Sequence, residues 1–377
     1  MVWLCLSLVA LGAFIALPAC DVARRVSNRL GAHDTAPIAG QEKPAHRAIP
    51  NTGGIGIAVA IGLPIAIGLL VANLVHAGTV GLPGWLGPAS VHVEGAADRT
   101  PMGIAFLGGL VVLHVLGLVD DRRPLGWLIK LVLMLGPAAV LAVFFQTRLL
   151  ELLDPYVGGA WLSVVATVLW FGVVINAMNF IDNMDGLSAG VAAIAGACFL
   201  AAALINGQWF VAGVLGLLVG ACCGFLVLNF PCAKLFMGDG GSLVIGYTLA
   251  FLTVRTTYVG DEGLASGAWY GVFMPLVVLA VPLYDFVTVT LIRLKEGRSP
   301  FVGSMQHLSH RLVRRGLTRR DAVLVIWGCT LLAGLSGVAL ATLRPWQAAL
   351  AVAQVGVLLV VLALLEYSSR PRGEGRA

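Results

Sequence analysis

Charged residues are scarce in this sequence. Lys, Arg, Asp and Glu make up only 11% of its 377 residues, whereas 59% of the residues are hydrophobic. Soluble domains carry about 25% charged residues, so this composition excludes a soluble domain and predicts an all-α polytopic membrane protein. The net charge of +5 is small, and we attribute it to membrane topology rather than to nucleic-acid binding.

The sequence also lacks a cysteine pattern that would hold a metal. None of its seven Cys has metal-ligand spacing, and most lie in apolar runs, where Cys acts as a small buried hydrophobic residue. No internal repeat is evident, which argues against a transporter built from inverted repeats. The first apolar segment has no basic region ahead of it and is followed by Arg24 and Arg25, which favours a retained span over a signal peptide.

Apolar segments of about the length of a membrane span recur along the whole chain. We count about eleven, of which the eighth is the shortest. They are Val2–Ala19, Gly53–Leu74, Met102–Val119, Trp127–Phe145, Trp161–Met178, Leu187–Leu204, Trp209–Leu228, Ser242–Thr257, Trp269–Leu291, Ala322–Leu343 and Trp346–Leu365. We expect one integral membrane domain over residues 1–377, which ends in a short disordered cytoplasmic tail from Glu366 to Ala377.

The distribution of basic residues predicts the orientation. With the N-terminus outside and eleven alternating spans, 20 of the 24 Lys and Arg residues fall on the inner side. Such an excess is typical of cytoplasmic loops, so the C-terminus is expected in the cytoplasm. Every notable polar cluster then lies on the cytoplasmic face, which predicts an active site that takes a cytosolic substrate. The clusters are Lys43–Gly54, Asp120–Arg123, Asn176–Asp185, Asn229–Ser242 and Arg293–Arg320.

The densest of these clusters closes the fifth apolar segment. Asn179, Asp182 and Asp185 recur every three residues there, so on a helix they would share one side. Amides and carboxylates at a membrane boundary indicate function by default. The alternative is a polar loop between two spans, in which Asn, Asp and Gly are common.

Two adjacent carboxylates, Asp120 and Asp121, end the third apolar segment. Neighbouring carboxylates raise each other's pKa unless a cation is present, and Mg²⁺ would relieve that cost. Arg122 and Arg123 follow and offer contacts to phosphate. The alternative is a simple stop signal at a helix end, in which Asp pairs with the neighbouring Arg.

The eighth segment is preceded by a glycine-rich turn, Phe236-Met237-Gly238-Asp239-Gly240-Gly241-Ser242. Glycines permit a tight turn and a close approach of the backbone to a ligand, and the start of the following helix favours phosphate. Asp239 is placed to hold Mg²⁺ against that phosphate. A lone glycine-rich turn is a weak signal, as is the basic stretch with Arg47 ahead of the second segment.

The last long loop carries His307 and His310 three residues apart, followed by Arg311. On a helix this spacing puts two imidazoles on one face beside a guanidinium, which can clamp a diphosphate. A zinc ion could bind the two histidines instead, but no third residue that could coordinate zinc lies at a suitable spacing. The alternative is a basic loop that lies on anionic lipid.

Together these clusters predict Mg²⁺-assisted phosphoryl transfer between a cytosolic nucleotide donor and a lipid in the membrane. Acidic groups would hold the metal, and basic groups would neutralise phosphates. A transporter or flippase is the alternative of another class. It would need charges near the middle of the membrane with access from both faces, and the charges here gather near the ends of the segments.

These motifs, in this order from about Lys43 to Leu317, resemble the polyprenyl-phosphate N-acetylhexosamine-1-phosphate transferase family, glycosyltransferase family 4. The resemblance implies transfer of a sugar 1-phosphate from a UDP-sugar to undecaprenyl phosphate, with release of UMP and use of Mg²⁺, for which Mn²⁺ can substitute. It also implies a multi-pass protein of the bacterial inner membrane that initiates a cell-envelope polysaccharide, such as the O-antigen of lipopolysaccharide, and that can form homodimers.

The resemblance carries residue roles with it. Asp120 and Asp121 match the paired catalytic aspartates, of which Asp120 is the suggested base for the lipid phosphate, and a covalent role for an aspartate stays open. Asp239 matches the Mg²⁺-binding aspartate. The remaining matches concern the donor: Asn179, Asp182 and Asp185 line the nucleotide site, Asn229 and Phe236 lie near the uracil, and His307, His310 and Arg311 handle the sugar and diphosphate.

The spacing of the histidines bears on the donor sugar. The related phospho-MurNAc-pentapeptide transferase has three consecutive His, whereas this chain has His307-Leu-Ser-His310, which is similar to the N-acetylglucosamine branch. Two positions depart from the family pattern. Arg122 follows the aspartates where a Lys is usual, with Lys130 in the next segment, and Asn183 stands where the pentapeptide transferase usually has Gly. We therefore expect UDP-N-acetylglucosamine as donor and keep the pentapeptide donor as the alternative.

Overall fold

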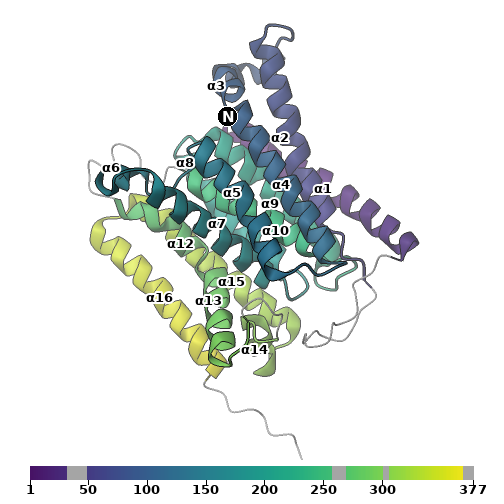
Figure 1. Ribbon diagram of the computed structural model, residues 1–377, viewed down its shortest axis with the longest axis vertical. Helices are drawn as coiled ribbons and strands as arrows, with labels where there is room; N and C mark the ends of the chain where they lie inside the picture. The colour runs from purple at the N-terminus through teal and green to yellow at the C-terminus, as the bar shows by residue number, and fades with distance from the viewer. Residues whose placement is uncertain (32–48, 257–268, 300–304, 368–377) are drawn as a thin grey trace, which may run out of the picture.

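The computed structural model describes residues 1–31, 49–256, 269–299 and 305–367 (Figure 1). Within these ranges the regular structure is entirely helical, as the composition predicts. The long helices are α1 (Val2–Leu30), α2 (Gly54–His76), α4 (Thr100–Asp120), α5 (Trp127–Phe144), α7 (Trp161–Phe180), α8 (Leu187–Ile205), α9 (Trp209–Asn229), α10 (Asp239–Arg255), α13 (Ala280–Lys295), α15 (Arg319–Ala339) and α16 (Pro345–Tyr367). Shorter helices are α3 (Val93–Asp98), α6 (Asp154–Val157), α12 (Met274–Val278) and α14 (Leu308–Arg314), with the 3₁₀ helices η1 (Gly84–His92), η2 (Glu151–Leu153), η3 (Trp269–Phe273) and η4 (Leu340–Thr342) between some of them.

The helices confirm a polytopic membrane protein, with one adjustment to the expected number of spans. Nine helices in the described ranges are long and apolar enough to cross a membrane. A bent pair, Tyr270–Val278 and Ala280–Lys295, raises the number to ten if it is one span. The eighth predicted segment is α10, which has 17 residues and is about 26 Å long. That length is short of the roughly 30 Å of a hydrocarbon core.

The short helix α10 lies inside the bundle. Every residue from Gly240 to Thr253 is buried, and α10 packs against α2, α4, α7 and α9. Two glycines explain how closely the neighbouring helices approach it. A Cβ at Gly117 of α4 would lie 2.2 Å from the nitrogen of Gly240, and one at Gly54 of α2 would lie 2.4 Å from the nitrogen of Gly241. Small residues of this kind let membrane helices pack backbone to backbone, and here they fix the start of α10.

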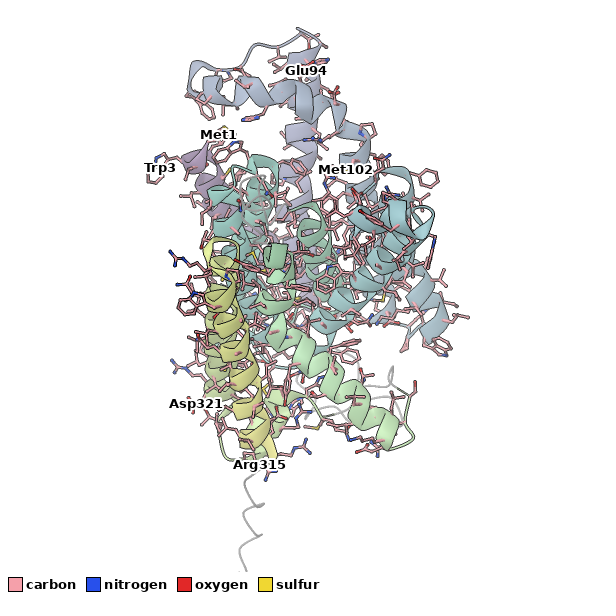
Figure 2. All side chains as sticks on the ribbon, turned by 90° about the vertical axis from the view of Figure 1, so that its left-hand side faces the viewer. Met1, Trp3, Glu94, Met102, Arg315 and Asp321 are labelled. Atoms are coloured by element: carbon pink, nitrogen blue, oxygen red, sulfur yellow. The ribbon has the colours of Figure 1, made fainter. Side chains whose placement is uncertain are left out.

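The loops divide between the two ends of the bundle. Figure 2 shows Met1 and Glu94 toward one end, and Arg315 and Asp321 at the opposite end. This is the separation that the charge distribution predicts, because the N-terminus and the loop with Glu94 were expected outside and the loop with Arg315 inside. Helix α16 lies at the edge of the bundle (Figure 1) and continues to Tyr367. Glu366, which was expected in the tail, is therefore helical, and the rest of the predicted tail from residue 368 lies outside the described residues.

Candidate functional site

Three helix ends meet at the end of the bundle that carries Arg315. Helix α4 ends at Asp120, α7 ends at Phe180 and α10 begins at Asp239. The first turn of α5 adds Lys130. The polar residues predicted from three separate stretches of sequence are thereby brought together around the start of α10.

Lys130 lies at the centre of this group. Its Nζ is 2.6 Å from Oδ2 of Asp120 and 2.5 Å from Oδ2 of Asp239. Asp120 also accepts a hydrogen bond from the backbone nitrogen of Leu125, at 2.8 Å. All three charged side chains are more than 70% buried, so water screens their attraction only in part. One ammonium group therefore joins a carboxylate at the end of α4 to a carboxylate at the start of α10.

The other oxygen of Asp239 and its backbone nitrogen are also engaged. Asn179 donates one hydrogen bond to Oδ1 of Asp239 and another to Oγ of Ser242, each at 2.9 Å. Asp121 accepts from the backbone nitrogen of Asp239, at 3.0 Å for its Oδ2. A carboxylate at this position satisfies one of the free N–H groups at the start of α10. Asn179, Asp120, Asp121 and Asp239 thus form one network, as the sequence predicts.

The expected alignment along one helix fails beyond Phe180, because α7 ends there. Asp182, Asn183 and Asp185 lie in the following turn, where Asn183 and Asp185 have different partners. Asp185 accepts from the backbone nitrogen of Ala233, at 3.0 Å. Asn183 accepts from the hydroxyl of Ser309. The three-residue repeat therefore places these groups at the same end of the bundle, but on different faces.

Burial and repulsion act on two of the aspartates. Desolvation, followed by the charges of Asp239 and Asp185, raises the pKa of Asp182 to about 8. Desolvation and the charge of Asp239 also raise the pKa of Asp121 well above its usual range. Both shifts have the same cause: five aspartates lie near one another, and Lys130 alone does not balance their charge. They are Asp120, Asp121, Asp182, Asp185 and Asp239.

Asn229 and Phe236 make hydrogen bonds that connect the segments around the site. Asn229 is buried, accepts from the backbone nitrogen of Gly186 at 2.5 Å and donates to the carbonyl of Leu235 at 2.8 Å. The backbone of Phe236 donates to the carbonyl of Pro50 at 2.7 Å and accepts from Gly53 at 2.9 Å. These bonds join the turn after α7, the turn before α10 and the segment before α2. The predicted residue Arg47 lies outside the described residues.

A second polar group surrounds Asp285 in α13. Its Oδ2 lies 2.8 Å from Nδ1 of His307, and its Oδ1 accepts from the backbone nitrogen of Leu308 at 2.6 Å. The imidazole of His307 also contacts the edge of Phe180, with 5.7 Å between ring centroids. Phe180 in turn carries the guanidinium of Arg293 over its face, 4.8 Å from the ring centroid. The end of α7 is therefore shared by both polar groups.

The predicted pair of imidazoles is only partly as expected. Helix α14 begins at Leu308, so His307 precedes it with an extended backbone, and the two rings are 6.4 Å apart. His310 is half-buried, and desolvation together with the charges of His307, Arg314 and Arg319 lowers its pKa to about 4. His310 is therefore uncharged near pH 7, and it would act as a hydrogen-bonding group rather than as a cation.

The guanidinium of Arg311 is directed into the protein. Its Nε lies 2.8 Å from Oε2 of Glu366, and its Nη2 donates to the hydroxyl of Thr288 at 3.0 Å. It also donates to the carbonyl of Gln306 and lies 4.0 Å from Oδ1 of Asp285. Because Arg311 is buried and engaged on these sides, its position favours a role in holding the loop.

Three residues of the site were missed by the sequence reasoning, and each left a signal. Lys130 was noted as a basic residue of the next segment, at some distance from the aspartates, and was given no role in the site. Asp285 is a carboxylate inside the apolar run of the ninth segment, and such a residue indicates function. Glu366 was assigned to the tail, although it directly follows the last apolar segment.

The donor set fits Mg²⁺, but not as a preformed cage. Carboxylate oxygens are the ligands that Mg²⁺ prefers, and it is usually held by one or two of them together with substrate phosphates. The excess negative charge around Asp239 supplies such groups. Within the part of the chain that the structure describes, no three His, Cys, Asp or Glu side chains converge on one metal position. A metal here would therefore depend on the substrate for further ligands.

The fold and the site define a class of protein: a polytopic helical membrane protein with an acidic site, compatible with phosphate ligands, at one end of its bundle. Comparison with known proteins gives the family. The family model described as glycosyl transferase family 4 matches residues 103–257, the part that contains Asp120, Lys130, Asn179 and Asp239. A Bacillus subtilis protein named "Probable undecaprenyl-phosphate N-acetylglucosaminyl 1-phosphate transferase" is 30% identical over 269 residues, which are 68% of this chain and 71% of that protein. The chain belongs to glycosyl transferase family 4.

Other relatives carry related names. A decaprenyl-phosphate N-acetylglucosaminephosphotransferase of Mycolicibacterium smegmatis is 29% identical over 355 residues, which are 88% of this chain and 81% of that protein. An undecaprenyl-phosphate alpha-N-acetylglucosaminyl 1-phosphate transferase of Escherichia coli K12 is 29% identical over 248 residues, which are 62% of this chain and 65% of that protein. All three names describe transfer of N-acetylglucosamine 1-phosphate to a polyprenyl phosphate.

Proposed function

We propose that this protein transfers N-acetylglucosamine 1-phosphate from UDP-N-acetylglucosamine to undecaprenyl phosphate. The observation that carries this proposal is the network in which Lys130 joins Asp120 to Asp239 beside Asp121 and Asn179, in a chain of glycosyl transferase family 4. The products are undecaprenyl diphosphate N-acetylglucosamine and UMP. The names of the relatives favour this donor over the pentapeptide donor.

The reaction exchanges one phosphoanhydride bond for another. An oxygen of the lipid phosphate attacks the phosphorus that carries the sugar, and the bond from that phosphorus to UMP breaks. Asp120 is placed to accept a proton from the lipid phosphate, because it lies at the end of α4 and is 15% exposed. Lys130 fixes the positions of Asp120 and Asp239 relative to each other, and it offsets the negative charge that the two phosphorylated substrates bring.

Mg²⁺ is part of this proposal. Asp239 would hold it together with the neighbouring Asp121, and the remaining ligands would come from the donor diphosphate and water. The metal would neutralise charge on the diphosphate as UMP leaves. The exposed side chains of Arg122 and Arg123 lie beside these aspartates and are free to contact phosphate oxygens.

The donor's nucleotide and sugar are assigned to the neighbouring groups. Asp185 and Phe236 lie on the loops that Asn229 joins, and we assign these loops to the uridine. His307 contacts Phe180 and lies near His310, and we assign these two histidines to the sugar and diphosphate. The buried network of Arg311 gives that residue a supporting role instead.

We place this end of the bundle in the cytoplasm of a bacterium, with the protein in the inner membrane. The support is the excess of Lys and Arg in the loops at this end, together with the cytosolic origin of nucleotide sugars. A transporter is less well supported, because the polar network lies at one end of the bundle and transport needs access from both faces.

A labelled donor tests the reaction type. Purified protein would be incubated with undecaprenyl phosphate, Mg²⁺ and UDP-N-acetylglucosamine carrying ³²P in the phosphate next to the sugar. We expect the ³²P to appear in the butanol-soluble lipid. If the sugar entered the lipid without that phosphorus, the protein would transfer a sugar alone, and the proposal would be wrong.

A further inference from the structure

The last helix of the chain is attached to the site by its final turn. Glu366 stands there with a side chain that is 0% exposed. Its carboxylate pairs with Arg311 at 2.8 Å, and its backbone carbonyl accepts from Nε of Arg315 at 2.7 Å. Two arginines of the basic loop therefore hold the same residue. A free carbonyl at a helix end is a favourable position for such a cation.

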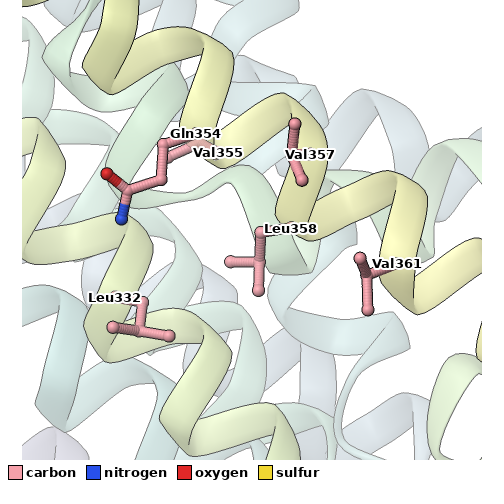
Figure 3. A pocket seen from close by; sticks show the side chains of 6 residues that line it. All are labelled: Leu332, Gln354, Val355, Val357, Leu358 and Val361. Carbon is pink, nitrogen blue, oxygen red and sulfur yellow. The ribbon is translucent and has the colours of Figure 1, made fainter.

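The rest of α16 is joined to the bundle more loosely. Its main contacts among the described helices are with α13, α14 and α15, and many of its apolar side chains are exposed. Midway along the helix, a groove of about 240 Å³ separates it from α15 (Figure 3). The groove is lined by Leu332, Gln354, Val355, Val357, Leu358 and Val361. The polar contacts of Glu366 are thus a principal attachment of α16 to the loop that follows α13.

The contacts of Glu366 continue to the candidate site through Arg311. The same guanidinium reaches Thr288 and the neighbourhood of Asp285 in α13. Asp285 in turn holds the imidazole of His307 and the backbone of Leu308. Glu366 contacts none of the groups assigned to substrates. It contacts Arg311, which supports His307 through Asp285.

We propose that Glu366 is a positioning residue: it holds Arg311 and thereby sets the position of His307 for the sugar diphosphate of the donor. This inference rests on the proposed function for the identity of the donor. The network leading from α16 to α14 is a property of the protein alone, so it is testable without a substrate.

The variants are Glu366→Gln, which removes the charge at nearly constant shape, and Glu366→Asp, which keeps the charge on a shorter side chain. Gln354→Leu is the matched control, because Gln354 lies on the same helix about 18 Å away along its axis. Hydrogen exchange of the purified proteins is measured first. We expect Glu366→Gln to speed amide exchange at least tenfold over residues 305–315, with exchange unchanged over residues 239–255.

Steady-state kinetics then separate positioning from simple support of the fold. We expect Glu366→Gln to raise KM for UDP-N-acetylglucosamine at least tenfold and to leave KM for undecaprenyl phosphate within about twofold. Glu366→Asp should recover part of the loss, and Gln354→Leu should match the wild type. Faster exchange throughout the bundle, or an unchanged KM for the donor, would overturn the positioning role.

Failure of the proposed function gives a different result. In that case the wild type would release no UMP from any donor, and the exchange experiment would decide the inference alone. Faster exchange limited to residues 305–315 would support the link from Glu366 to the loop, and unchanged exchange there would overturn it.

Discussion

Replacing Lys130 by Met tests the centre of the proposed site. Methionine keeps most of the volume of the lysine side chain and removes its charge. Lys130 makes two charge-assisted hydrogen bonds, at 2.5 and 2.6 Å, each worth about 1.5–3 kcal/mol. These bonds set the resting arrangement of the site, whereas turnover depends on the charge that Lys130 offsets as the phosphates react. Loss of one such preorganised group lowers turnover by about 10²–10³-fold, and we expect a loss of that size.

The assay is UMP release by protein that elutes as a single folded species in detergent. Lys234→Met is the control, because Lys234 is an exposed lysine in the turn before α10 and should retain its activity. Mg²⁺ titration adds a second readout. Without the ammonium group the site is more negative, so Mg²⁺ should bind at least as tightly although turnover is low.

A specific outcome would refute this reasoning. If Lys130→Met kept more than about a third of wild-type turnover, the lysine would merely occupy the place of a cation that Mg²⁺ supplies. An equal loss in Lys234→Met would show that any lost charge on this face is harmful. Either result would remove Lys130 from the catalytic network.

Three further substitutions test neighbouring parts of the site. Asp239→Asn should cost at least about 100-fold in turnover, because it removes a charged metal ligand; near-normal turnover with a normal Mg²⁺ requirement would disprove that assignment. His307→Ala should lower turnover at least tenfold while membrane insertion, followed by the yield of folded protein, stays normal; lost insertion would mean that the loop is structural. The pKa of Asp182 is about 8 in the folded protein and about 3.9 in an unfolded chain, so without metal the folded state loses stability as the pH rises between these values. The gain in melting temperature from Asp182→Asn should therefore grow from pH 5 to pH 8 and level off above it, whereas the exposed control Asp98→Asn should show no such trend.

Much of the fold follows from the sequence, because long apolar runs can be satisfied in a membrane only as helices. Nine predicted segments coincide with helices long enough to cross it. The two exceptions are the ninth segment, which is bent between α12 and α13, and α10, which has only 17 residues and begins with glycines. These glycines permit close packing inside the bundle, which a count of hydrophobic residues does not measure.

The core of the site was also predictable, since Asp120, Asp121, Asn179 and Asp239 are polar groups at the ends of apolar runs on the same side. The pairing within the site was not. Lys130 and Asp239 are 109 residues apart, and one basic residue near a cytoplasmic loop looks like any other. Asp285 and Glu366 were missed because their meaning depends on the bend between α12 and α13 and on the place where α16 ends.

Donor choice decides whether this chain transfers N-acetylglucosamine 1-phosphate to a polyprenyl phosphate, as we propose. Purified protein with undecaprenyl phosphate and Mg²⁺ would receive UDP-N-acetylglucosamine, UDP-N-acetylgalactosamine or UDP-MurNAc-pentapeptide in separate reactions, and UMP release would be followed. We expect release of UMP with UDP-N-acetylglucosamine and none with the pentapeptide donor. Release only with the pentapeptide donor, or with none of the three, would contradict the proposal.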